Sequence, residues 1–107
     1  MIIEPTPWFL RQVKRLSRKY PSITADIRAL SHSLEEDPLQ GTQLRRGCFK
    51  IRMAISSKNK GKSGGSRVIT CVRTEHDTLY LLDIYDKSER DSISDEELDA
   101  LLENINE

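Results

Sequence analysis

The chain has 107 residues, with 17 Lys and Arg, 17 Asp and Glu and no net charge at pH 7. That length supports one modest hydrophobic core and not two, so a single domain over residues 1–107 is predicted. No apolar run is long enough to span a membrane and no cationic leader is present, which predicts a cytoplasmic, reduced protein. Cys48 and Cys71 lack neighbouring His or Cys ligands, which favours two buried thiols over a disulfide or a metal site.

The zero net charge conceals an uneven distribution. Residues 38–74 contain nine basic residues and no acidic one, whereas residues 75–107 contain two basic and twelve acidic residues. This polarity predicts a positive face that binds a polyanion, most simply a nucleic-acid backbone. The acidic C-terminal segment is expected to keep that face from binding every polyanion.

The first part of the chain predicts a short edge strand and two helices. Ile2 and Ile3 form the strand before Pro5, and Thr6-Pro7 then caps an amphipathic helix that ends before Pro21. Ser22 begins a second helix that ends near Glu36. The short connection predicts an antiparallel pair. The apolar stripes of the two helices are Phe9, Val13, Leu16 and Tyr20, then Ile23, Ile27, Leu30 and Leu34.

The central stretch predicts two strands around a basic loop. From Phe49 to Ile55, apolar residues alternate with Lys50, Arg52 and Ala54, so one face packs on a core and the other shows cations. A flexible loop of Lys, Gly and Ser follows, and Arg67 opens the next strand. The run Thr78–Tyr85 predicts a central strand in which Asp83 is either paired or reaches solvent at the basic face, and Arg67 or Arg52 is a candidate partner.

A closing helix completes the predicted fold. Ser94 and Glu97 form a capping box ahead of the apolar positions Leu98, Leu101, Leu102 and Ile105. The fold class is therefore α+β: a small four-stranded antiparallel sheet with an N-terminal helix hairpin and a C-terminal helix, with the helices on one face. His32 and His76 are expected on a helix flank and in a turn, as surface residues and not as catalysts.

Several motifs follow one another in an order that resembles a known family. They are Asp37-Pro38-Leu39-Gln40-Gly41, then FKIRMA, GKSGGSRVI and LYLLDIYDKSE. In this order they resemble the RelE and HigB toxins of type II toxin–antitoxin modules, in the RelE/ParE superfamily. The resemblance implies a microbial-RNase-like fold, cleavage of mRNA on the ribosome without a cofactor or metal ion, inhibition of translation, and a cognate antitoxin as partner.

Such cleavage has the ribose 2′-hydroxyl attack the adjacent phosphate, which requires a base, cations and an acid. Arg67 matches the family's strand arginine and is the candidate for holding the scissile phosphate, with Arg52 and Lys50 beside it. Lys87 matches a basic position at the strand end, and Tyr85 and Asp86 are the nearest groups that exchange a proton. The residues expected to bind RNA are Arg45, Arg46, Lys58, Lys60, Lys62 and Arg73.

The chain departs from the family at two positions. Ser88 and Ser94 stand where many relatives have an arginine and a tyrosine, and neither histidine matches those of HigB-like relatives. Two alternatives therefore stay open: a non-catalytic toxin that poisons DNA gyrase, as the ParE branch does, and an RNA- or ribosome-binding module. The basic cluster around Arg67 argues against the first, and the two departures leave the second open.

Overall fold

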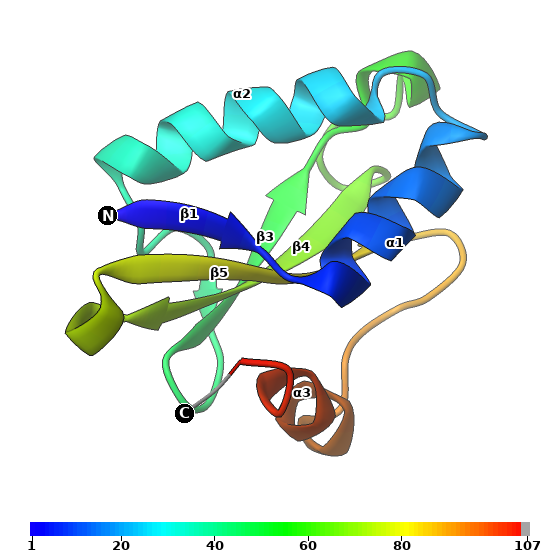
Figure 1. Cartoon of the computed structure of the whole chain (residues 1–107). Coiled ribbons are helices and arrows are strands. Elements are labelled where there is room, and N and C mark those ends of the chain that lie inside the picture. The colour runs from blue at the N-terminus through cyan, green and yellow to red at the C-terminus, as the bar shows by residue number, and fades with distance from the viewer. Residues whose placement is uncertain (106–107) are drawn as a thin grey trace.

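The protein folds into one sheet with helices on both of its faces. The structure is a computed structural model that describes residues 1–105. Within that range the sheet has five strands in the order β1-β5-β4-β3-β2, and the chain forms three α-helices. Figure 1 shows how these helices are arranged around the sheet. The elements are β1 (Ile2–Pro5), α1 (Pro7–Ser17), α2 (Ile23–Glu36), β2 (Thr42–Gln43), β3 (Cys48–Met53), β4 (Ser66–Arg73), β5 (Thr78–Asp86) and α3 (Asp95–Leu102).

The sheet is mixed, so the prediction of four antiparallel strands is wrong in two respects. β1 pairs parallel with β5, Ile3 lying opposite Leu79. The direction is set by the crossover, because β1 is separated from the rest of the sheet by both α1 and α2. The second difference is β2, a two-residue strand in a segment predicted to be a loop, which pairs with Phe49 and Lys50 at the other edge.

The sheet separates two hydrophobic clusters. On one face α1 and α2 bury Phe9, Leu16, Ile23 and Leu34 against β3, β4 and β5. On the other face α3 buries Leu98 and Leu102. The prediction that all helices lie on one face is therefore wrong: β4 and β5 are apolar on both faces, and each face needs a cover.

An irregularity in β5 decides which side chains reach which face. The register of β4 against β5 shifts between Ile69 and Thr70, and Leu82 has no partner in it. Leu82 is thus an inserted residue of the β-bulge type. As a result Leu81 and Ile84 both face α1 and α2, whereas Leu82 and Tyr85 both face α3.

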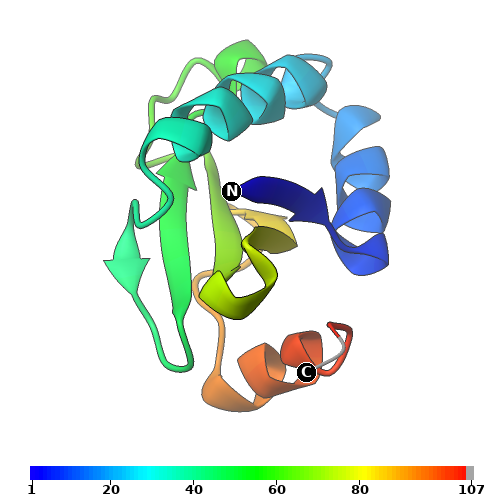
Figure 2. The ribbon, with the colours of Figure 1, turned by 60° about the vertical axis from the view of Figure 1, so that its left-hand side comes forward.

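Local signals fix the helix starts as the sequence indicates. The Thr6 hydroxyl accepts a hydrogen bond from the Phe9 amide at the start of α1. At the start of α3, Ser94 and Glu97 form the capping box. α1 and α2 do not lie antiparallel along their lengths: Figures 1 and 2 both show them meeting at the short connection and diverging from it. No helix in the described part of the chain is long and apolar enough to cross a membrane.

The two cysteines are buried thiols, as predicted. Cys48 lies directly opposite Cys71 in the pairing of β3 with β4, on the face covered by α3. Burial and the neighbouring thiol favour the protonated state of Cys48: the hydrogen bond with Cys71 and desolvation both raise its pKa. They are therefore core side chains.

Candidate nucleic-acid interface

Three strands bring the central predicted site residues into one row. Arg52 on β3 lies opposite Arg67 on β4, and Arg67 lies opposite Tyr85 on β5. Because side chains alternate along a strand, Lys50 shares the face of Arg52. Beside this row is a cleft of about 320 Å³, lined by Gln40, Gly41, Thr42, Lys50, Ile51, Arg52 and Lys62. The edge of β3 and the basic loop thus form a positively charged cleft.

The cations of this cleft have no acidic partner among the described residues. Lys50, Arg52 and Lys62 form no salt bridge with any residue in the range 1–105, although the protein pairs many of its other cations. Arg52 and Lys62 are exposed and Lys50 is half-buried. The positive charges of this cleft are therefore available to bind an anion that carries several negative groups.

Arg67 lies just beneath this surface. Its exposed fraction is 5%, and its guanidinium donates hydrogen bonds to backbone carbonyls of the preceding loop. Nη1 lies 3.1 Å from the carbonyl oxygens of both Lys62 and Ser66, and Nη2 lies 3.3 Å from that of Ser63. Arg67 therefore fixes the end of the basic loop while its charge stays close to the cleft.

Asp83 is not a partner of Arg67 or Arg52, which corrects the prediction. Its Oδ1 accepts a hydrogen bond from the Trp8 indole at 3.0 Å and its Oδ2 one from Arg90 at 3.2 Å. On β4 the residue opposite Asp83 is Ile69, and β1 stops pairing with β5 at Leu81, so the edge near Asp83 is open to Trp8 and Arg90. Burial raises the pKa of Asp83, and the Trp8 and Arg90 hydrogen bonds reduce that effect.

Tyr85 lies on the predicted face but under another side chain. Its hydroxyl is buried and has no hydrogen-bond partner among the described residues. The Arg90 guanidinium lies 4.7 Å from the centre of its ring. Burial raises the pKa of Tyr85 and so favours its protonated form. Sequence reasoning did not single out Arg90, whose only signal was its position shortly after the strand.

Asp86 lies on the opposite face from Tyr85. Its carboxylate is fully buried and accepts hydrogen bonds from the Tyr20 hydroxyl and from Lys58 Nζ, both at 2.6 Å. Burial alone would raise the pKa of Asp86, but the hydrogen bonds from Lys58, Tyr20 and Ser88 outweigh it and hold the pKa well below its ordinary value. The structure thus separates Asp86 from Tyr85 and Lys87, as the alternation of a strand requires.

Lys87 returns to the face of Tyr85 and binds an acidic residue that was not predicted. Its ammonium contacts the carboxylate of Asp91, four residues further on. The hydrogen bond from Lys87 lowers the pKa of Asp91, with smaller contributions from the charges of Arg67 and Lys50. Asp91 therefore lies close enough to the cation row for the charges of Arg67 and Lys50 to act on it.

The remaining predicted RNA-binding residues fall into three groups. Arg45 and Arg46 bind the acidic side chains of α3, at 3.5 Å from Asp95 and 3.3 Å from Asp99 respectively. Arg73 donates to the Arg46 carbonyl at 2.8 Å, next to the same helix. Lys58 is held by Asp86, with its side chain 10% exposed. Lys60 and Lys62 remain exposed on the loop beside the cleft.

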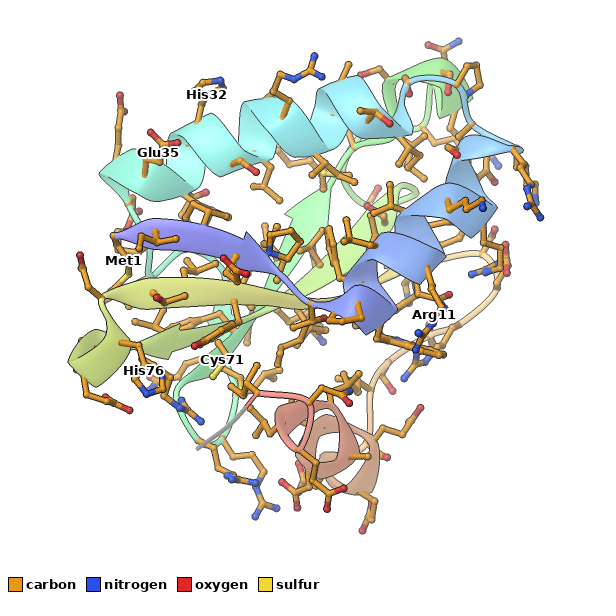
Figure 3. All side chains as sticks on the ribbon, in the orientation of Figure 1. Met1, Arg11, His32, Glu35, Cys71 and His76 are labelled. Carbon is orange, nitrogen blue, oxygen red and sulfur yellow. The ribbon has the colours of Figure 1, made fainter. Side chains whose placement is uncertain are left out.

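The histidines lie apart from the cation row. Figure 3 shows His32 on the outer side of α2 and His76 at the turn between β4 and β5. His76 Nδ1 is 3.1 Å from the Tyr80 hydroxyl. Within the described residues, no group of three or more His, Cys, Asp or Glu side chains is arranged to hold a metal ion.

A comparison with protein families identifies the family to which the chain belongs. Residues 6–106 match the family described as the RelE toxin of the RelE/RelB toxin–antitoxin system. The match spans nearly the whole chain, including the helices, all of the antiparallel strands and the cation row. The chain therefore belongs to the RelE toxin family, and it is the toxin of a toxin–antitoxin module whose partner is a cognate antitoxin.

Proposed function

We propose that this toxin is an endoribonuclease that cleaves mRNA on the ribosome, in the cytoplasm, and thereby inhibits translation. The observation that carries the proposal is the set of cations around the cleft, Lys50, Arg52 and Lys62, which form no salt bridge within residues 1–105, with Arg67 behind them. A single-stranded RNA backbone offers a phosphate for each of these charges. The family membership supports the same substrate class.

In the proposed reaction the ribose 2′-hydroxyl attacks the adjacent phosphorus and the bond from phosphorus to the 5′-oxygen breaks. The 2′-hydroxyl loses its proton and the leaving 5′-oxygen gains one, which gives a 2′,3′-cyclic phosphate and a 5′-hydroxyl. Arg52 and Lys50 bind the phosphate oxygens directly, and Arg67 adds positive charge from below. Fixed cations stabilise the phosphorane more than the substrate because its negative charge is greater.

Tyr85 is the proposed proton donor to the leaving oxygen. Its raised pKa keeps the hydroxyl protonated, and that hydroxyl is not engaged with any other described residue. Arg90 must move off the ring before substrate reaches it. Lys87 is the alternative donor, whereas Asp86 is excluded from this role by its position on the other face. The need to expose Tyr85 predicts slow cleavage.

The second candidate is a toxin that binds RNA or the ribosome without cutting. The buried Tyr85 hydroxyl and the enclosed Asp86 favour it, since neither exchanges protons with a bound substrate as the side chains stand. Both candidates use the same cleft. They differ in whether RNA is cut.

The test is a cleavage assay with purified ribosomes programmed with a defined mRNA. The proposal expects cuts within codons that leave 2′,3′-cyclic phosphate ends, and loss of cutting in Lys50→Ala/Arg52→Ala. Translation arrest with intact mRNA would instead support the binding toxin. If the protein neither cuts mRNA nor arrests translation, and DNA in treated cells is relaxed or broken, the result would point to gyrase as the target.

A further inference from the structure

The loop that carries Lys60 and Lys62 is attached to the protein at its start by a buried ion pair. Lys58 Nζ lies 2.6 Å from Asp86 Oδ1, in contact with the fully buried carboxylate at the end of β5. The Tyr20 hydroxyl donates to the other carboxylate oxygen at 2.6 Å. Lys58 also lies over the Tyr20 ring, 5.5 Å from its centre. Three segments far apart in the sequence therefore meet at Asp86.

A second carboxylate holds the same part of the loop from the side of α2. Asp26 accepts hydrogen bonds from the Ser56 amide at 3.0 Å and from the Ser56 hydroxyl at 2.5 Å. The hydroxyl of Ser22 accepts a hydrogen bond from the Ser57 amide at 2.9 Å. Residues 56–58 are consequently bonded on two sides, which argues against a freely moving loop.

The far end of the loop is also attached. Arg67 donates to the carbonyls of Lys62 and Ser63, and the Gly65 carbonyl accepts from the Lys87 amide at 3.0 Å. At Gly65 a side chain would not fit, because an added Cβ would lie 2.4 Å from the Met53 carbonyl oxygen. The segment with Lys60 and Lys62 is thus a short span between two fixed ends.

We propose that Lys58, Asp86 and Tyr20 form a buried latch that positions the loop, so that Lys62 at the cleft and Lys60 on the same loop carry fixed rather than mobile charges. Asp86 and Lys58 are then positioning residues, which act on the RNA through the two exposed lysines. Asp86 also accepts from the Ser88 amide at 2.9 Å. It therefore orients the turn that follows Lys87 as well as the loop.

The latch gives the loop a lower ordering cost on binding. A free segment must lose backbone and side-chain conformational entropy when it binds a phosphate. A segment held at both ends has already lost most of it. The favourable free energy of the lysine–phosphate contacts is then offset less by the entropic cost of ordering the loop, so more of it appears as affinity. The role in RNA binding rests on the proposed function, whereas the fixing of the loop does not.

The experiment uses the full-length chain with Lys58→Met, Asp86→Asn, both together, and Lys58→Arg. Lys60→Met is the matched control, since it removes a lysine of the same loop that has no ion pair in the described chain. Amide hydrogen exchange of residues 59–65 is measured without RNA. Affinity for a single-stranded RNA oligonucleotide and the single-turnover rate at saturating RNA are measured separately.

We expect exchange in residues 59–65 to rise about tenfold or more in Lys58→Met and in the double variant, with β3 and β4 unchanged. RNA affinity should fall several-fold while the rate at saturation stays near that of the parent, and Lys58→Arg should restore both properties. Lys60→Met should weaken affinity without changing exchange. The double variant covers the case in which Lys58→Met fails to fold, because it leaves no unpaired buried carboxylate.

Unchanged exchange in the folded double variant would overturn the latch. Faster loop exchange with unchanged RNA affinity would overturn its role in binding. If the parent protein cuts no RNA, the proposed function fails, but the exchange and affinity measurements still decide the inference.

Discussion

Arg67 donates hydrogen bonds that hold the backbone of the basic loop, and it also lies near the site of the proposed reaction. Arg67→Ala removes the charge beneath the cleft, which should lower the single-turnover rate on the order of a hundredfold. It also removes the hydrogen bonds that Arg67 donates to three backbone carbonyls, so the free energy of unfolding should fall by about 1–3 kcal/mol. Single-turnover cleavage and urea denaturation measure the two effects. A normal rate with reduced stability would restrict Arg67 to holding the loop.

Arg67→Lys serves as its control. A lysine keeps the charge but cannot reach several carbonyls with a planar fork. Compared with Arg67→Ala, the single-turnover cleavage rate should be partly restored, and the free energy of unfolding should be restored to a smaller extent. Equal recovery of both would mean that charge alone accounts for the residue.

Tyr85→Phe isolates the hydroxyl as the proposed proton donor. The ring keeps its packing, and no hydrogen bond is lost because the hydroxyl has no partner among the described residues. Stability should therefore stay within about 0.5 kcal/mol of the parent. The cleavage rate should fall by about two orders of magnitude, as for a lost general acid. An unaltered rate would assign proton transfer to Lys87.

Asp86 predicts a particular dependence of stability on pH. Its folded pKa lies below the unfolded value of about 3.9, so its ionised form stabilises the fold at and above that pH. That stabilisation is lost as the pH falls through the folded pKa. Asp86→Asn should be less stable at pH 6 by on the order of 3 kcal/mol. The difference from the parent in urea denaturation should shrink towards pH 3, and a constant difference would contradict the assignment.

At the scale of elements, the basic loop should bind RNA with two lysines rather than three. Replacing Lys60 and Lys62 with Ala should reduce the slope of log affinity against log salt by roughly one unit per lysine. Binding is measured by fluorescence anisotropy of a labelled RNA at several salt concentrations. A further reduction on adding Lys58→Ala would show that Lys58 contacts RNA despite its burial.

Strand periodicity predicted the faces of β3 well. Lys50 and Arg52 share a face because the alternation of apolar and polar residues fixes it locally. The pairing of Arg52 with Arg67 then places Arg67 on the same face, although β4 itself does not alternate. The two edges of the sheet were predicted less well. The parallel pairing of β1 depends on where α1 and α2 carry the chain, and the two residues of β2 are too few to give a pattern.

Partners of buried charges could not be derived from local pattern. Asp83 lies in a strand whose register is shifted by one residue, and its partner Trp8 is 75 positions away in the sequence. Lys58 looks like its neighbours Lys60 and Lys62 in sequence, yet it alone of the three reaches Asp86. Such choices depend on tertiary packing, which the spacing of residues does not encode.

At the scale of the whole molecule, the acidic C-terminal part neutralises one side of the protein. Glu89, Asp95 and Asp99 bind Arg15, Arg45 and Arg46, whereas Asp91 and Glu97 bind Lys87 and Arg90 of the same segment. None of these carboxylates forms a salt bridge with Lys50, Arg52 or Lys62. On the surface of the toxin, Lys50, Arg52 and Lys62 therefore offer the cognate antitoxin positive charge that no salt bridge within residues 1–105 neutralises.

We expect a short acidic segment of the antitoxin to cover that cleft. Co-expression should restore growth, and the complex should protect Lys50 and Lys62 from acetylation by an amine reagent, as read by mass spectrometry. Lys14 on α1 is the control and should stay reactive. Growth rescue without any physical complex would rule out this mode of neutralisation.

The parallel pairing of β1 with β5 also bears on how the toxin is made. Ile2 pairs with Thr78, so the sheet cannot close until residues 78–86 have left the ribosome. The hairpin of β3 and β4 needs only neighbouring sequence and can form earlier, whereas contacts between distant segments form slowly. Trp8 and Tyr20, which bind Asp83 and Asp86, belong to that late group. In a nascent chain, the basic residues of β3, β4 and the loop would thus be present before β5 has formed the contacts with β1, Trp8 and Tyr20 that complete the sheet.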